Sequence, residues 1–138
     1  VLETMKEFGL ERGKNGLKVY LMCEIPSNVI LAEKFLELCD GFSIGSNDLT
    51  QCLLGIDRDN SQLTTIGDER NEAVKEMIVK IIKICKERGK YIGICGDIPS
   101  TDPDYAIFLA KEGIEAISLS PDAVMKTILY FLKVATKK

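Results

Sequence analysis

Three groups of polar residues each follow a short apolar segment, and their types could support acid–base or metal chemistry. Glu24 ends the first segment, Asn47 and Asp48 follow the second, and Cys95 ends the third. Two carboxylates together would suit a hard cation such as Mg²⁺, which takes one or two protein carboxylates plus water and substrate oxygens. An ordinary thiol has a pKa near ~8.5 and could exchange a proton after modest tuning.

The residues around the second group could also bind a small ligand. Gly45 would allow a ligand to approach the backbone closely, and the side chains of Ser46 and Asn47 can donate hydrogen bonds. Each candidate also has a plain structural explanation. A glutamate at a strand end often forms a salt bridge, Asn-Asp often caps a helix, and a lone cysteine is usually a core residue. Spacing alone leaves both interpretations open.

Apolar periodicity predicts alternating strands and helices that would position these residues. The predicted strands are Lys18–Ile25, Gly41–Ser46, Tyr91–Cys95 and Ala116–Leu119; the predicted helices are Val1–Gly9, Asn28–Leu38, Asn71–Arg88, a helix capped by Thr101 or Asp102 and ended by Gly113, and a last helix opened by Ser120-Pro121. This alternation is typical of a parallel sheet with crossover helices. The three polar groups would then share the edge where the strands end.

A long loop, from about Leu49 to Arg70, is predicted after the second strand. Loops at the carboxyl ends of parallel strands carry the sites of such folds, and loops of this length usually serve a site. Four strand–helix units are half of an eightfold barrel, which needs ~250 residues. An open, doubly wound sheet is the structural alternative. Because the helix at Val1–Gly9 has no preceding cap and no initiator methionine, we expect a piece of a longer chain.

Composition limits the classes of function. The 138 residues are 46% hydrophobic and 28% charged, with a net charge of −3, which predicts a globular domain that binds neither nucleic acid nor a membrane surface. A cytoplasmic location with reduced thiols is expected. The chain has no histidine and no CxxC pair, so a Cys/His zinc site is not expected. We assign the remaining cysteines, Cys23, Cys39, Cys52 and Cys85, to the core.

Several sequence motifs resemble those of the phosphoenolpyruvate-utilising enzymes, a family that includes phosphoenolpyruvate synthase, pyruvate phosphate dikinase and enzyme I of the sugar phosphotransferase system. The run 40–58, DGFSIGSNDLTQCLLGIDR, resembles the second family signature. MCEIP (22–26) resembles the strand with the metal-binding glutamate, and GICGD (93–97) resembles the strand with the catalytic cysteine. CEIPSN and DERN are most similar to the synthase branch. Asp97 departs from the Glu or Gln that is usual in the family.

The resemblance implies that residues 1–138 are the C-terminal half of a (β/α)8 barrel in a multidomain, homo-oligomeric enzyme. Such an enzyme converts ATP, pyruvate and water to AMP, phosphoenolpyruvate and phosphate. A phosphohistidine on another domain carries the phosphoryl group from a nucleotide-binding domain to pyruvate in the barrel. The missing histidine agrees with a carrier elsewhere.

The resemblance also implies a role for each matching residue. Glu24 and Asp48 match the Mg²⁺ ligands. Cys95 matches the acid–base that exchanges a proton at the pyruvate methyl carbon. The positions that match substrate-binding residues are Glu24, Gly45, Ser46, Asn47, Asp48 and Arg58. The isolated chain is expected to be inactive, because the nucleotide site and the carrier lie elsewhere. Two alternatives stay open: the dikinase or enzyme I within the family, and a non-catalytic assembly module.

Overall fold

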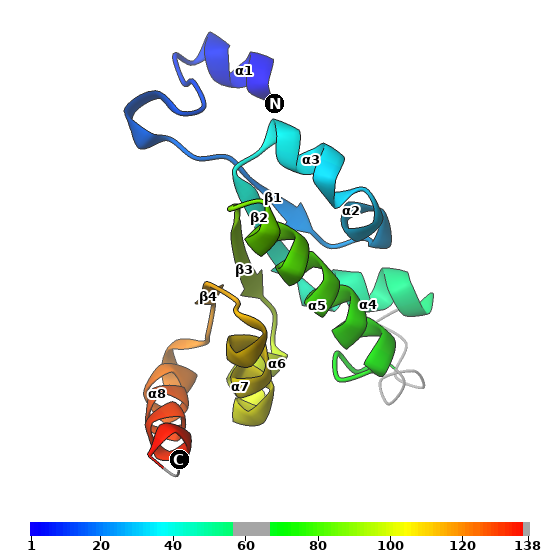
Figure 1. The fold of residues 1–138 in the computed structure, drawn as a ribbon, viewed down its shortest axis with the longest axis vertical. Coiled ribbons are helices and arrows are strands. Elements are labelled where there is room, and N and C mark those ends of the chain that lie inside the picture. The colour runs from blue at the N-terminus through cyan, green and yellow to red at the C-terminus, as the bar shows by residue number, and fades with distance from the viewer. Residues whose placement is uncertain (57–66, 137–138) are drawn as a thin grey trace.

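The computed structural model describes residues 1–56 and 67–136, and within these ranges the chain is an α/β protein (Figure 1). One sheet contains four parallel strands in the order β1-β2-β3-β4. The strands are β1 (Tyr20–Cys23), β2 (Gly41–Gly45), β3 (Tyr91–Cys95) and β4 (Ala116–Ile117). The predicted class, with four parallel strands, is confirmed.

The strand bounds differ from the prediction mainly at the outer strands. β3 has the predicted bounds, and β2 ends one residue early because Ser46 already begins a helix. β1 is shorter than predicted, since its pairing with β2 stops at Cys23. β4 pairs with β3 through two residues only, so the apolar segment that continues to Leu119 is not strand.

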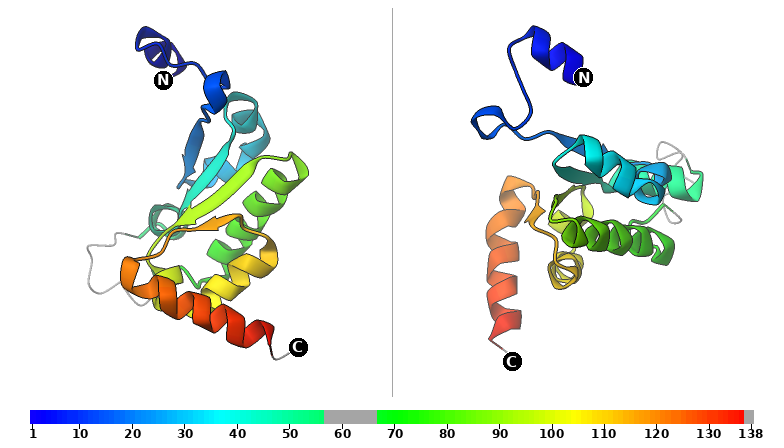
Figure 2. Two further views of the ribbon diagram at one scale, coloured as in Figure 1. Left: turned by 90° about the vertical axis from the view of Figure 1, so that its left-hand side faces the viewer. Right: turned by 45° about the horizontal axis from the view of Figure 1, so that its top comes forward.

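The helices follow the strands in the expected alternation. α2 (Pro26–Ile30) and α3 (Ala32–Leu38) follow β1, α4 (Ser46–Leu54) and α5 (Glu72–Glu87) follow β2, α6 (Ile98–Thr101) and α7 (Pro103–Glu112) follow β3, and α8 (Pro121–Ala135) follows β4. α1 (Leu2–Glu7) and a short 3-10 turn, η1 (Lys14–Gly16), precede β1. α1 and α8 lie at opposite ends of the molecule (Figures 1 and 2).

Two predicted boundaries are wrong. The helix predicted over Asn28–Leu38 begins at Pro26 and is interrupted at Leu31, whose backbone leaves the helical region. The loop predicted from Leu49 starts later, because α4 continues to Leu54 and ends at Gly55, which has a φ of 64°. Glycine adopts this left-handed conformation with little strain, which favours it at helix ends.

The remaining helix ends follow the sequence signals. The side chains of Asn71 and Asp102 each accept a backbone N–H in the first turn, and they cap α5 and α7. Gly89 and Gly113 follow the carboxyl ends of the same two helices with positive φ. The boundaries of these two helices therefore agree with the capping residues in the sequence.

The core lies between the sheet and the connecting helices. Alternate strand residues, among them Phe42, Ile44, Ile92 and Ile94, pack in one cluster with the apolar face of α5. Cys23, Cys39 and Cys85 are buried there, as predicted. Cys52 is exposed, so its assignment to the core is wrong. α4 buries Ser46, Leu49 and Thr50, and position 52 lies on the opposite face of that helix.

The other residues of each strand point to the second face of the sheet. Met22, Ser43 and Gly93 are register partners across β1, β2 and β3, and Gly45 is paired with Cys95. This face is open over β1, where Met22 remains 42% exposed. Toward the carboxyl ends of the strands on this face, Ser43 and Cys95 are partly exposed. We call this end of the sheet the carboxyl edge.

The opposite end of the sheet, which we call the amino edge, is stabilised by an ion pair and by hydrogen bonds to backbone groups. Arg12 donates from Nε and Nη2 to the Asp40 carboxylate, both at 3.1 Å, and Val19 N–H donates to Asp40 at 2.8 Å. Arg12 Nη2 and Lys90 Nζ both donate to the Cys39 carbonyl at 2.8 Å. The Arg12 hydrogen bond, with that from Val19, holds the pKa of Asp40 below its usual value. These contacts join the N-terminal segment to the start of β2 and β3.

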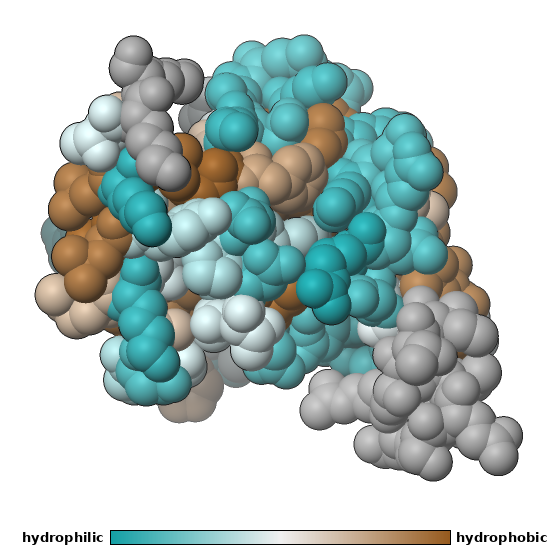
Figure 3. All heavy atoms as spheres, turned by 90° about the horizontal axis from the view of Figure 1, so that it is seen from below, coloured by the Kyte–Doolittle hydropathy of each residue, from teal (hydrophilic) through white to brown (hydrophobic). Residues whose placement is uncertain are grey.

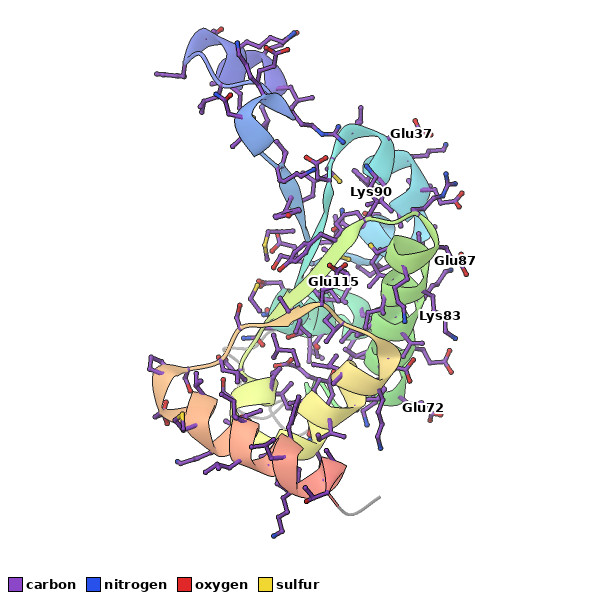
Figure 4. All side chains as sticks on the ribbon, turned by 60° about the vertical axis from the view of Figure 1, so that its left-hand side comes forward. Glu37, Glu72, Lys83, Glu87, Lys90 and Glu115 are labelled. Atoms are coloured by element: carbon purple, nitrogen blue, oxygen red, sulfur yellow. The ribbon has the colours of Figure 1, made fainter. Side chains whose placement is uncertain are left out.

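Two helices present very different outer surfaces. Figure 4 shows Glu72, Lys83 and Glu87 pointing outward from α5. Figure 3 shows apolar side chains gathered over α8, whose exposed residues include Met125, Ile128, Leu129 and Leu132. Within the described residues, no helix combines the length and the apolar character needed to cross a membrane.

Candidate active site at the carboxyl edge of the sheet

The carboxyl edge brings together the candidate residues from three separate parts of the sequence. Glu24 directly follows β1, Gly45 ends β2, and Cys95 ends β3 beside Gly45. A Cβ atom placed on Gly45 would lie 3.2 Å from Glu24 Oε2, so the Glu24 carboxylate lies over this glycine. Glu24 and Cys95 therefore both lie beside Gly45, at the edge where the prediction placed them. Arg58 lies outside the described residues.

The Cys95 thiol is half-buried and is held by the neighbouring strand. Its Sγ atom lies 3.4 Å from Ser43 Oγ, and it donates to the Ile44 carbonyl at 3.5 Å. A purely structural cysteine would be enclosed like Cys23 or Cys85, whose pKa burial raises to about 12. Cys95 is instead oriented by polar groups at an accessible edge, which suits proton transfer.

The first turn of α4 carries the second group. Ser46 is fully buried, Asn47 is half-buried and Asp48 is exposed. Gly45 is the N-cap of this helix, and no side chain caps it. Neither Asn47 nor Asp48 therefore has the capping role that is the plain explanation for an Asn-Asp pair. Both side chains remain available for other contacts at the carboxyl edge.

Asn47 is tied to the end of β3 by Asp97. Asn47 Nδ2 donates to Asp97 Oδ2 at 2.9 Å, and the backbone N–H of Asp97 donates to Asn47 Oδ1 at 3.5 Å. This reciprocal contact fixes which side of the amide faces Asp97. One N–H of Asn47 and a second lone pair on its oxygen remain for a ligand. Asp97 thus contributes here despite its departure from the family pattern.

Glu69 and Ser43 belong to this site, although sequence reasoning did not select them. Asn71 does cap α5, but Glu69 in the same run is buried against Ser46 and Gly96. Burial raises the pKa of Glu69. No local signal in the sequence distinguishes Glu69 from a solvated charge. Ser43 could have been found from its position two residues before Gly45 on the same strand face.

Glu24 and Asp48 have the donor chemistry for a hard cation. Among the described residues, no Lys or Arg forms an ion pair with either carboxylate. No group of three or more His, Cys, Asp or Glu side chains in the described ranges could hold a metal without other ligands. Carboxylates of this kind are ligands that Mg²⁺ accepts, with water or substrate oxygens in its other positions.

Comparison with known proteins agrees with the resemblance seen in the motifs. Residues 1–135 match the family model described as "PEP-utilising enzyme, PEP-binding domain". The chain belongs to this family. It is 53% identical over 137 residues to phosphoenolpyruvate synthase of Aquifex aeolicus, covering 99% of this chain, and 58% identical over 127 residues to the enzyme of the same name from Helicobacter pylori, covering 92%. It spans only 16% of the length of each relative.

A solved structure supports the fold. A HpcH/Hpal aldolase/citrate lyase family protein from Burkholderia cenocepacia superposes with a TM-score of 0.61 at 17% sequence identity. The match covers 97% of this chain and 48% of that protein. Its family has a TIM-barrel-like fold, so the four parallel strands correspond to part of such a barrel.

Proposed function

We propose that this chain is the C-terminal half of the phosphoenolpyruvate-binding barrel of a phosphoenolpyruvate synthase. It would provide the site where pyruvate receives a phosphoryl group from a phosphohistidine carrier, within the conversion of ATP, pyruvate and water to AMP, phosphoenolpyruvate and phosphate. The convergence of Cys95, Asn47 and the Glu24 carboxylate at one edge carries this proposal. Identity of 53–58% to synthases along the chain supports it.

Cys95 would perform the proton transfer. As a thiolate, it takes a proton from the pyruvate methyl carbon, and the C–H electron pair moves toward the carbonyl oxygen to form the enolate. That oxygen then accepts the phosphoryl group. In the reverse direction the thiol returns the proton to carbon. The contacts with Ser43 and the Ile44 carbonyl would hold the sulfur on the accessible face of the sheet.

The carboxylates and the start of α4 would bind the substrate. Glu24 and Asp48 would hold Mg²⁺, which when bound would stabilise negative charge on the substrate oxygens. The free N–H of Asn47 would donate to a substrate oxygen, and Gly45 leaves room for the Glu24 carboxylate that would hold the metal. We keep the proposed substrate role of Arg58 on the family resemblance alone.

Other parts of the enzyme would complete the site. The exposed apolar face of α8 and the unpaired outer edges of β1 and β4 suit packing against four further strand–helix units. The carrier histidine and the nucleotide site would lie on other domains, because this chain has no histidine. We expect a cytoplasmic homo-oligomer, and we expect the 138-residue chain alone to make no phosphoenolpyruvate.

The test uses the complete enzyme with ATP and pyruvate. Formation of phosphoenolpyruvate, AMP and phosphate, without any requirement for added phosphate, would support the synthase reaction. A requirement for inorganic phosphate would favour the dikinase, and transfer only to a separate carrier protein would favour enzyme I. If the enzyme forms no phosphoenolpyruvate and binds neither pyruvate nor oxalate with Mg²⁺, the proposal is wrong and a non-catalytic assembly module is favoured.

A further inference from the structure

Glu69 is the only charged side chain that is buried among the described residues. It is 9% exposed, and its Oε2 atom is buried without a hydrogen-bond partner of regular geometry in these ranges. Its main chain is also fixed, because Tyr105 Oη of α7 donates to the Glu69 carbonyl at 3.2 Å. Burying a carboxylate costs several kcal/mol unless it is paired or becomes neutral. Its position against the candidate active site therefore needs an explanation.

A second buried polar group faces the same small space. Ser46 Oγ is fully buried and also lacks a regular hydrogen-bond partner among the described residues. A Cβ atom on Gly96 would overlap Ser46 Oγ and would lie 3.2 Å from Glu69 Oε2. The hydroxyl and the carboxyl group therefore meet over Gly96, and only glycine leaves room for both. A hydroxyl donor and a carboxyl acceptor are chemically complementary.

We propose that Glu69 is a positioning residue whose carboxyl group holds the Ser46 hydroxyl over Gly96 and so fixes the first turn of α4 against the end of β3. The inference rests on the proposed function, because this turn carries Asn47 and Asp48. The proposed effect of Glu69 on these two side chains passes through Ser46. Burial raises the pKa of Glu69, which agrees with an enclosed contact of this kind.

The position of the contact predicts which kinetic parameter changes. Asn47 and Asp48 lie on α4, whereas Cys95 lies on β3 and is held by Ser43 and the Ile44 carbonyl. Loosening α4 should weaken binding of pyruvate and Mg²⁺ and leave the proton-transferring thiol in place. The Michaelis constant should therefore rise much more than the turnover number falls.

The experiment compares Glu69→Ala, Glu69→Gln and a control, Glu72→Gln, in the complete enzyme. Glu72 points outward from α5 and lies three residues along the chain (Figure 4). Glu69→Ala should raise KM for pyruvate about tenfold and change kcat less than about threefold, as expected for a buried hydrogen bond. Hydrogen exchange should accelerate at the amides of α4. Glu69→Gln should restore most of both properties, since its amide can still bond to Ser46, and Glu72→Gln should match the parent.

Each outcome has a separate meaning. Parental KM and parental α4 exchange in Glu69→Ala would overturn the positioning role while leaving the proposed function intact. If Glu69→Ala does not fold, a double-mutant cycle between Ser46→Ala and Glu69→Met decides, because methionine keeps the side-chain volume and removes the acceptor; additive effects would overturn the inference. A parent enzyme that forms no phosphoenolpyruvate would refute the proposed function, whereas exchange at α4 still tests the contact itself.

Discussion

The two ends of the same parallel strands are built on different principles. At the amino edge, Arg12, Lys90, Asp40 and the Cys39 carbonyl satisfy one another within 3.1 Å. At the carboxyl edge, among the described residues, the Ser46 hydroxyl and the Glu69 carboxyl lie buried without regular partners, and Glu24 has no ion pair. The polar groups of the amino edge are fully paired within the protein, whereas at the carboxyl edge Glu24 is left without an ion pair among the described residues.

The contrast suggests a division between stability at one end of the strands and the proposed function at the other. In parallel α/β folds, residues at the amino ends of the strands stabilise the fold and those at the carboxyl ends bind substrate. Removing a charged side chain from the amino edge should therefore lower the stability of the fold. Substitutions at the carboxyl edge should instead lower activity before they lower stability. Four substitutions test this comparison, in order of decreasing expected effect.

The largest effect is expected at Cys95. Cys95→Ala in the complete enzyme should lower phosphoenolpyruvate formation by ~10²–10⁴, because the proposed acid–base would be lost. Exchange of pyruvate methyl protons with deuterated solvent, followed by NMR, measures the step directly. Cys52→Ala, at an exposed position of α4, serves as the control and should exchange normally. Parental exchange in Cys95→Ala would show that Cys95 is a packing residue.

Removal of a proposed metal ligand should have the next largest effect. Asp48→Asn should weaken Mg²⁺-dependent oxalate binding by at least about tenfold, since even indirect ligand partners cost 10–100-fold. Calorimetric titration of oxalate at fixed Mg²⁺ measures this change. Thermal stability should not fall, because Asp48 is exposed and forms no ion pair with a described residue. Glu37→Gln on α3 is the matched control, and equal losses in both variants would contradict the assignment.

At the amino edge the expected change is in stability. Arg12→Met should lower the free energy of unfolding by about 1–2 kcal/mol at neutral pH, measured by urea unfolding, because Asp40 loses a charged donor. The folded pKa of Asp40 lies below 3.8, so its contribution is present above pH 3.8 and is lost as the pH falls through the folded pKa. This acid dependence should flatten in Arg12→Met. An unchanged acid dependence would show that the pair contributes little.

The smallest effect is expected at Asp97, which connects the two strand ends without contacting the thiol. Asp97→Ala should raise KM for pyruvate about fivefold with little change in kcat, because Asn47 loses its charged acceptor at 2.9 Å. Initial-rate kinetics over a range of pyruvate concentrations separate the two parameters. Glu115→Gln, exposed before β4, is the control. A fall in kcat alone would place Asp97 in the chemical step.

Much of the fold follows from local patterns in the sequence. Alternating apolar segments identified all four strands, and Asp102 and Gly113 marked helix ends correctly. The pairing of β4 was overestimated, because an apolar run of strand length gives no sign of where hydrogen bonding stops. The part of α4 from Leu49 onward was predicted as loop, because the helix buries the polar Ser46 and Thr50 and so shows little apolar periodicity.

The site was only partly accessible from the sequence. Glu24, Asn47, Asp48 and Cys95 stand out at strand ends, so their convergence could be expected from parallel topology. The contact of Ser43 with Cys95 joins residues 52 positions apart, and the burial of Glu69 depends on Ser46, Gly96 and Tyr105. Such contacts arise from tertiary packing, which no local propensity encodes.

The long connection between β2 and β3 shows how little free energy is lost when the chain between two adjacent strands is lengthened. The chain from Gly45 to Tyr91 is more than twice as long as that from Cys23 to Gly41, yet both join adjacent strands. β2 and β3 still pair through five consecutive residues. Because loop-closure entropy grows only with the logarithm of length, each doubling costs about 0.6 kcal/mol. Insertions in the loops at the carboxyl edge should therefore destabilise the fold only slightly, so that related sequences can gain new ligand contacts there.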